Sequence, residues 1–129
     1  MSERYERGME IRRRLVPDGH SDALDELAEF APDFARLTVE VPFGEIYARP
    51  GLDLKERELV TLAAIGALGA EAQFRVHVRY ALNAGLTPAQ IIEVAMQVAV
   101  YAGWPRGAQA IRAAKEAIEE ARDVEADTS

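Results

Sequence analysis

The sequence predicts an all-α fold, a single-domain helical bundle with about six helices. Apolar residues recur at helical spacing in most of the chain, and capping residues, prolines and glycines mark where the helical segments begin and end. The alternating pattern typical of strands is almost missing, apart from a short ambiguous run at residues 37–41. A chain of 129 residues is long enough for one domain with its own core. We expect this domain over residues 1–118, followed by an acidic, frayed C-terminal tail over residues 119–129.

The first third of the chain predicts three helices. A charged helix is expected near residues 3–15, and the proline and glycine within residues 16–20 end it. Ser21 is suited to cap a second helix, because its hydroxyl can accept an unpaired backbone N–H. Pro32 suits the first turn of a third helix, which runs towards Val41.

A helical hairpin is expected in the middle of the chain. Residues 42–52 contain two prolines and two glycines and are predicted to be irregular. Asp53 followed by Glu56 resembles a capping box that opens a helix over residues 54–68. A second helix is predicted over residues 70–84, and glycines mark the ends of both.

Two further helices complete the predicted bundle. Thr87 and Gln90 form a second capping box with proline at the first helical position. The helix that follows, residues 91–101, is apolar nearly all round, so we expect it to be buried on more than one side. In so short a chain this predicts a subunit interface. Residues 103–105 turn into a last, alanine-rich helix.

The composition excludes several classes of function. The formal net charge of −7 argues against nucleic acid as a partner, because phosphate binding requires clustered Lys and Arg. The chain contains no apolar run of membrane-spanning length and no signal-peptide pattern, so we expect a cytoplasmic protein without a membrane partner. The absence of cysteine excludes disulfides, thiolate metal sites and thiol chemistry.

The most informative residue is His77, one of two histidines in the chain. On a helix, six small, aromatic or amide side chains lie within about 60° of its direction. They are Ala70, Gln73, Phe74, Tyr80, Ala81 and Ala84. An ionisable ring directed at such a face predicts either proton transfer or a core histidine bonded to a backbone carbonyl, and the residues leave both interpretations open.

Glu58 is the natural companion of His77. An antiparallel hairpin that turns near Gly69 would place the two helices side by side, so the carboxylate could orient or charge the imidazole. The alternative for Glu58 is a surface acid beside Arg57. We do not expect a metal site, because no second histidine or acidic residue stands at helical ligand spacing from His77. No serine-nucleophile motif is present either, which leaves general acid–base chemistry.

An anionic substrate would need a cation outside the histidine helix. Arg75 and Arg79 project about 160° away from His77, so they are not expected to share its pocket. Arg49, in the irregular segment, is the first choice as carboxylate anchor. Weaker candidates are Arg13 and Arg106. Tyr101 and Trp104 are expected to pack within the protein, with either able to border the pocket.

Four blocks of the sequence, in order, resemble the carboxymuconolactone decarboxylase family, and together they run from Arg4 to about Ile118. The blocks are an N-terminal segment (Arg4-Tyr5, Gly8-Met9, Arg12-Arg13, His20 and Asp22), a central loop (44–52) and two helical stretches (77–85 and 101–105). The resemblance implies an all-α homo-oligomer, a hexamer, that acts without a cofactor. It also implies the reaction: loss of carbon dioxide from γ-carboxymuconolactone, giving β-ketoadipate enol-lactone in aromatic catabolism.

The residues and the resemblance together predict a carboxy-lyase site. We expect His77 to act as general acid or base, Glu58 to orient it, and Arg49 to anchor the substrate carboxylate. The further candidates for substrate binding are Gln73, His20 and Tyr101.

Two functions are alternatives to decarboxylation. The active site of the alkylhydroperoxidase branch of the same superfamily has the pattern Glu, then Cys-x-x-Cys, then His four residues after the second cysteine. Its two cysteine positions are Ala70 and Gln73 here, so thiol peroxidase activity is excluded. The remaining alternative is a non-enzymatic helical oligomer or small-acid binding protein on the same scaffold.

Overall fold

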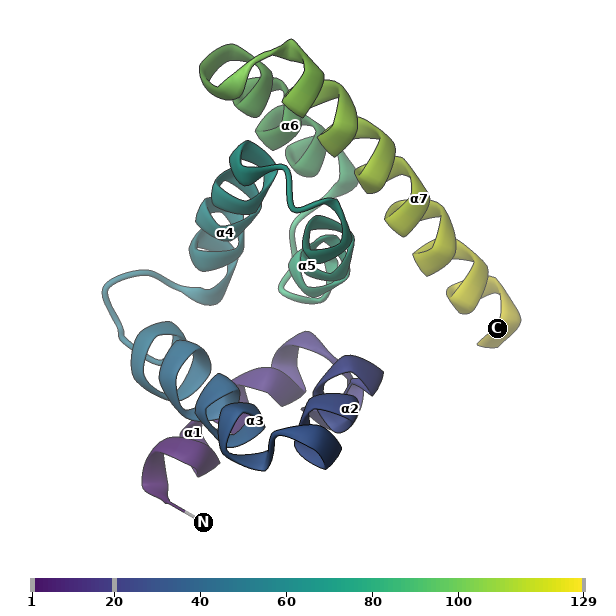
Figure 1. The fold of residues 1–129 in the computed structure, drawn as a ribbon. Coiled ribbons are helices and arrows are strands. Elements are labelled where there is room, and N and C mark those ends of the chain that lie inside the picture. The colour runs from purple at the N-terminus through teal and green to yellow at the C-terminus, as the bar shows by residue number, and fades with distance from the viewer. Residues whose placement is uncertain (1, 20, 129) are drawn as a thin grey trace. The chain divides into compact units, whose positions relative to one another are not determined.

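The computed structural model describes residues 2–19 and 21–128 of the chain. Within those ranges the fold is all-α, with seven α-helices, a short 3₁₀ turn and a π-helix, and no strand, which confirms the predicted fold class. The α-helices are α1 (Glu3–Leu15), α2 (Asp22–Phe30), α3 (Pro32–Thr38), α4 (Leu54–Leu68), α5 (Glu71–Asn83), α6 (Pro88–Ala102) and α7 (Trp104–Thr128). They fall into two compact units, Met1–Leu54 and Lys55–Ser129 (Figure 1).

The helices of the first unit begin where the sequence predicts. The Ser2 hydroxyl accepts the Tyr5 amide at 3.1 Å and caps α1. The Ser21 hydroxyl accepts the Leu24 amide at 3.2 Å and caps α2, as expected from its position before an apolar periodic segment. Between the two helices lies the 3₁₀ turn, Pro17–Gly19.

The segment around Pro42 differs from the prediction. The chain stays helical beyond α3 and forms the π-helix η2 over Val39–Tyr47, so only residues 48–53 between η2 and α4 are irregular. A proline inside an α-helix removes a hydrogen bond and collides with the carbonyl four residues earlier. The wider π-helical turn accommodates the ring without ending the helix. The ambiguous run 37–41 is helical as well.

Helix α1 packs directly on η2, and two glycines allow the close approach. A Cβ atom at Gly8 would collide with the carbonyl oxygen of Val39, and one at Gly44 would collide with the carbonyl oxygen of Arg4. Any larger residue at either position would push the two helices apart. The buried apolar residues of this unit are Met9, Leu15, Leu24, Ala35, Val39, Phe43 and Leu54.

A buried carboxylate, Glu40, lies where α1 meets η2. Its side chain is 2% exposed; it accepts the Ser2 hydroxyl at 2.7 Å, is paired with Arg36, and lies 3.5 Å from Arg4. The Ser2 hydrogen bond, together with the charges of Arg36 and Arg4, holds the pKa of Glu40 below its ordinary value, although burial opposes this shift.

The second unit contains α4 to α7. Helix α4 spans the predicted residues 54–68, and α5 spans the predicted 70–84 less one residue at each end. The second capping box is present at α6: the Thr87 hydroxyl accepts the Gln90 amide at 3.1 Å, and the Gln90 side chain accepts the Thr87 amide at 2.9 Å. Helix α7 continues through the acidic segment to Thr128.

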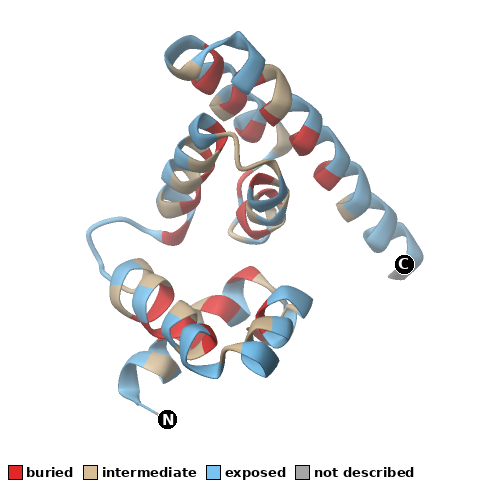
Figure 2. Cartoon of the chain, in the orientation of Figure 1, coloured by how far each residue is buried: buried red, intermediate tan, exposed pale blue. Residues whose placement is uncertain are grey.

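The core of the second unit is formed by the inner faces of its helices (Figure 2). Alanines on α7 let this helix approach α5 and α6 closely, and a Cβ atom at Gly107 would collide with Ala99 on α6. The central cluster of buried residues is Leu62, Phe74, Val78, Ala81, Leu86, Ile91, Ala95, Ala110, Ala113, Ala114, Ala117 and Ile118.

One face of α6 is apolar and uncovered. Ile91, Ala95 and Val98 are buried in the core, while Ile92, Met96 and Val100 on another side of the same helix are exposed. Helix α6 is therefore apolar on more than one side, as predicted, but among the described residues of the second unit only one side is covered. In the described part of the chain, no helix has the length and apolar character to cross a bilayer.

The lowered pKa of Glu40 predicts an acid-sensitive contribution to stability. Because the folded-state pKa lies below the ordinary 4.5, this contribution is complete above that pH and is lost as the pH falls through the folded-state value. Urea unfolding between pH 7 and pH 3 should therefore give a stability advantage of the wild type over Glu40→Gln that shrinks with acidification. The exposed Glu26→Gln is the matched control and should track the wild type. A difference between wild type and Glu40→Gln that does not change with pH would contradict this assignment.

Candidate active site

The structure brings Glu58 and His77 together. Glu58 lies in the second turn of α4 and His77 in the middle of α5, and His77 Nδ1 is 3.1 Å from Glu58 Oε2. The Glu58 side chain has no solvent exposure, and that of His77 is 16% exposed. The hairpin geometry expected from the sequence therefore places a carboxylate and an imidazole in hydrogen-bonding contact, with the imidazole on the more accessible side.

The reversal between α4 and α5 makes this contact possible. Gly69 adopts a φ of 74°, a left-handed conformation that favours glycine, and the Ala70 amide donates to the Ile65 carbonyl at 3.1 Å. The Arg106 guanidinium donates to the Leu68 carbonyl at 3.2 Å and supplies a positive charge at the C-terminus of α4. Arg106, a weaker candidate for the carboxylate anchor, thus has a structural partner at this turn.

The rotation of α5 about its axis is set by contacts on two sides. Phe74, Val78 and Ala81 are buried in the core of the second unit and lie along one side of the helix. Elsewhere on α5, Arg75 pairs with Glu116 of α7 at 2.7 Å. The direction in which α5 presents the imidazole therefore follows from packing and from this ion pair.

The geometry assigns the two nitrogens of His77 different tasks. Glu58 accepts at Nδ1, so Nδ1 carries hydrogen when Glu58 is ionised, a tautomer that we infer from the contact. Nε2, at the other end of the ring, is then a lone-pair acceptor in neutral imidazole and an N–H donor in imidazolium. A carboxylate–imidazole pair of this kind can take up and release a proton at one defined atom.

An aromatic ring completes the surroundings of His77. The centroid of Tyr80 lies 4.9 Å from that of the imidazole, with 66° between the planes, and Tyr80 is 7% exposed. The sequence placed Tyr80 on the same helix face but indicated no role, because an aromatic residue at helical spacing is ordinarily a core residue.

The structure does not gather all the predicted binding residues. Gln73 is exposed on α5 one turn before His77, a spacing that places both on one helix face. Tyr101 and Trp104 are 82% and 72% exposed, so the expectation that they pack within the chain is wrong. Gly103, with a φ of 105°, turns the chain between α6 and α7 and leaves both rings on the outside of this corner.

The remaining predicted residues lie in the first unit or beyond the described ranges. Arg49 is exposed in the irregular segment after η2, and Arg13 is exposed on α1. His20 falls outside the described residues. The roles of Arg49 and His20 in substrate binding stay predictions.

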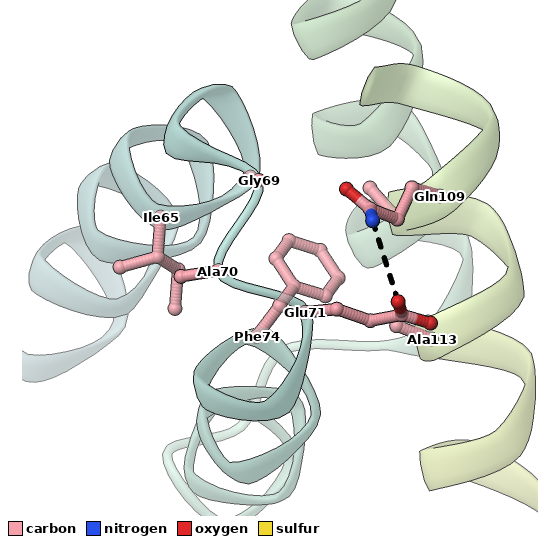
Figure 3. A pocket seen from close by; sticks show the side chains of 9 residues that line it. Ile65, Gly69, Ala70, Glu71, Phe74, Gln109 and Ala113 are labelled. Atoms are coloured by element: carbon pink, nitrogen blue, oxygen red, sulfur yellow. Dashed lines mark hydrogen bonds between the residues drawn. The ribbon is translucent and has the colours of Figure 1, made fainter. Parts of the chain in front are cut away.

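A small cavity lies between the start of α5 and α7, and Figure 3 shows it. Phe74 forms part of its wall, and Glu71 accepts a hydrogen bond from Gln109 at 3.3 Å beside it. Its volume of about 10 Å³ is sufficient for one water, and His77 is not among its lining residues. This cavity is too small for an organic acid. Among the described residues, no three His, Asp or Glu side chains come together as metal ligands would.

The fold and the Glu58–His77 pair define a small all-α protein with a site suited to proton transfer. The model of the carboxymuconolactone decarboxylase family matches residues 32–116. The chain belongs to this family, as the sequence predicted.

Individual relatives support a carboxy-lyase role. The chain is 34% identical to a 4-carboxymuconolactone decarboxylase of Acinetobacter baylyi over 92% of its own length and 89% of the relative. It is 30% identical to a nitrosuccinic acid decarboxylase of Metarhizium robertsii over 92% of its own length and 84% of the relative. It is also 34% identical to an uncharacterized 15.0 kDa protein of Paracoccus denitrificans, over 84% of this chain and 82% of the relative.

Proposed function

We propose that this protein is a cytoplasmic decarboxylase that converts γ-carboxymuconolactone to β-ketoadipate enol-lactone in aromatic catabolism, without a cofactor. The observation that carries the proposal is the contact of the buried Glu58 carboxylate with His77 Nδ1, 3.1 Å apart. The family membership and the decarboxylase of Acinetobacter baylyi, 34% identical over most of both chains, support this choice of substrate.

The reaction requires stabilisation of charge and one proton. Cleavage of the bond to the carboxylate releases carbon dioxide and leaves its electron pair on the ring carbon. The pair is delocalised into the lactone carbonyl as a dienolate, so hydrogen-bond donors near that oxygen lower the barrier. A proton delivered to carbon then completes the enol-lactone, and the proton donor is restored from water.

His77 is the proton donor in this scheme. As imidazolium it gives the proton on Nε2 to the carbanionic carbon, while Glu58 accepts at Nδ1 and balances the positive charge. Because Glu58 is fully buried, little water screens this pairing. After the transfer the neutral ring keeps its hydrogen on Nδ1, so Nε2 is ready to be protonated again.

Four further residues are proposed to bind the substrate. Arg49 anchors the carboxylate of the substrate, since a guanidinium matches a carboxylate in charge and shape. Gln73, one turn before His77 on α5, offers an amide donor to the developing oxyanion. His20 and Tyr101 are further binding residues in this proposal.

Nitrosuccinic acid is a second candidate substrate, and its decarboxylation can be assayed directly. The relative in Metarhizium robertsii is named for nitrosuccinic acid, a substrate whose nitro group would accept the electron pair that the lactone carbonyl accepts here. In both molecules, loss of the carboxylate leaves a carbanion that is conjugated with a strong electron acceptor. We propose the lactone as the principal substrate because the identity to its decarboxylase is higher, at 34% against 30%.

We also propose that the protein is a homo-oligomer, a hexamer, whose subunits meet through the uncovered face of α6. Ile92, Met96 and Val100 on α6 and Trp104 and Ile111 on α7 are all exposed. A groove of about 240 Å³ beside them is lined by Met96, Trp104 and Ile111 among others, and it can accept side chains of a second copy. Apolar surface of this extent on a small protein is typical of an interface between subunits.

Turnover is tested by carbon dioxide release from γ-carboxymuconolactone with purified protein. The wild type should release it, and His77→Ala should lower kcat by about 100-fold or more, the usual contribution of a positioned proton donor. Val76→Ala, a substitution of the exposed neighbour on α5, is the matched control and should keep wild-type activity.

Full turnover by His77→Ala would overturn the assigned role. If neither the lactone nor nitrosuccinic acid is turned over, while small carboxylic acids bind and His77→Ala weakens that binding, the alternative of a non-enzymatic binding protein replaces the decarboxylase.

The interface is tested by light scattering after gel filtration. Val100→Lys places a charge in the apolar face and should convert the oligomer to smaller species. Glu26→Gln changes the net charge by the same amount on an exposed position of α2 and should leave the mass unchanged. An oligomer that withstands Val100→Lys, or a monomeric wild type, would contradict the proposed interface.

A further inference from the structure

The imidazole of His77 is bounded by two groups, a carboxylate and a phenol ring. Glu58 Oε2 is 3.1 Å from Nδ1, and the Tyr80 centroid is 4.9 Å from the imidazole centroid at an interplanar angle of 66°. Tyr80 follows His77 by three residues on α5, so the two side chains are neighbours on the same helix face. Tyr80 is 7% exposed, which shows that its ring is enclosed by the protein and not free to move aside.

The carboxylate alone does not determine the orientation of the imidazole. The torsion that rotates a histidine ring about its Cβ–Cγ bond is soft, with broad and roughly two-fold preferences. A half-turn would replace Nδ1 by a carbon at Glu58, and smaller rotations would lengthen the hydrogen bond while Nε2 swings away from a bound substrate. An enclosed ring beside the imidazole blocks such rotations by steric contact.

The inclined arrangement of the two rings also favours a defined contact. Aromatic rings prefer edge-to-face or offset packing at centroid separations such as that found here. The ring of Tyr80 further occupies space beside the imidazole, and excluding water from an ion pair strengthens the electrostatic attraction between its two groups.

We propose that Tyr80 is a positioning residue for His77: its ring keeps Nδ1 on Glu58 and thereby directs Nε2 to the substrate. The expected effect of Tyr80 on turnover rests on the proposed function. The expected effect of Tyr80 on the orientation of the imidazole does not depend on any substrate. The role is assigned to the aromatic ring of Tyr80, so phenylalanine should replace it and an aliphatic side chain should not.

The experiment compares Tyr80→Phe, Tyr80→Leu and Tyr80→Met in the full-length protein by ¹⁵N NMR of the histidine rings. The chain has two histidines, so His77→Ala assigns the signals. In the wild type and Tyr80→Phe, with the ring neutral, Nδ1 should have the shift of a protonated nitrogen and Nε2 that of an unprotonated one. In Tyr80→Leu and Tyr80→Met the shifts should move towards the Nε2–H tautomer, which the histidine side chain prefers when it is free in water.

Turnover gives the second readout. The two aliphatic variants should lose about 10-fold in kcat with KM changed by less than about twofold, because the substitution alters the direction of proton transfer more than binding. Tyr80→Phe should retain kcat within about twofold. Methionine is flexible and fills irregular gaps in a core, so Tyr80→Met keeps the test available if Tyr80→Leu does not fold.

The outcomes separate this inference from the proposed function. An altered tautomer in the aliphatic variants supports the positioning role even if the wild type decarboxylates no lactone. Unchanged ¹⁵N shifts in both aliphatic variants overturn it, whether or not the wild type is active. Loss of the wild-type tautomer in Tyr80→Phe overturns it as well, because the hydroxyl and not the ring would then hold His77.

Discussion

The burial of the Glu58 carboxylate is the constraint on which the site depends. A carboxylate without solvent exposure is costly unless donors compensate for the lost water, and His77 on the neighbouring helix is one of those donors, at 3.1 Å. The left-handed turn at Gly69 and the packing of α5 in the core allow the two groups to meet. A burial of this kind contributes little net stability.

The two buried glutamates of the chain illustrate how partners decide the role of a carboxylate. Glu40 is held by the Ser2 hydroxyl and by two arginines, which keep their charge at all ordinary pH values and fix the carboxylate as an anion. Glu58 is paired instead with the imidazole of His77, a group that can both bind and release a proton. The first arrangement joins α1 to η2, whereas the second offers the two protonation states that the proposed proton transfer needs.

Helix-capping residues predicted much of the helical framework, because a cap and the backbone groups that it binds are only a few residues apart in the sequence. Ser21 and Thr87 start α2 and α6 as expected, and the hairpin near Gly69 brings Glu58 to His77. The π-helix was missed because Pro42 ordinarily ends an α-helix. The surroundings of Glu40 and the exposure of Trp104 were not predicted, because they depend on contacts distant in sequence or on the direction of a turn.

We propose that Glu58 and His77 act as one unit in proton transfer. A double-mutant cycle on turnover is the sharpest test of this proposal. Residues that act as a unit are strongly non-additive. We expect Glu58→Gln and His77→Ala each to lower kcat. The kcat of the double variant should lie within about threefold of that of His77→Ala. If the two losses in kcat instead multiply in the double variant, Glu58 and His77 act independently, which would contradict their proposed action as one unit.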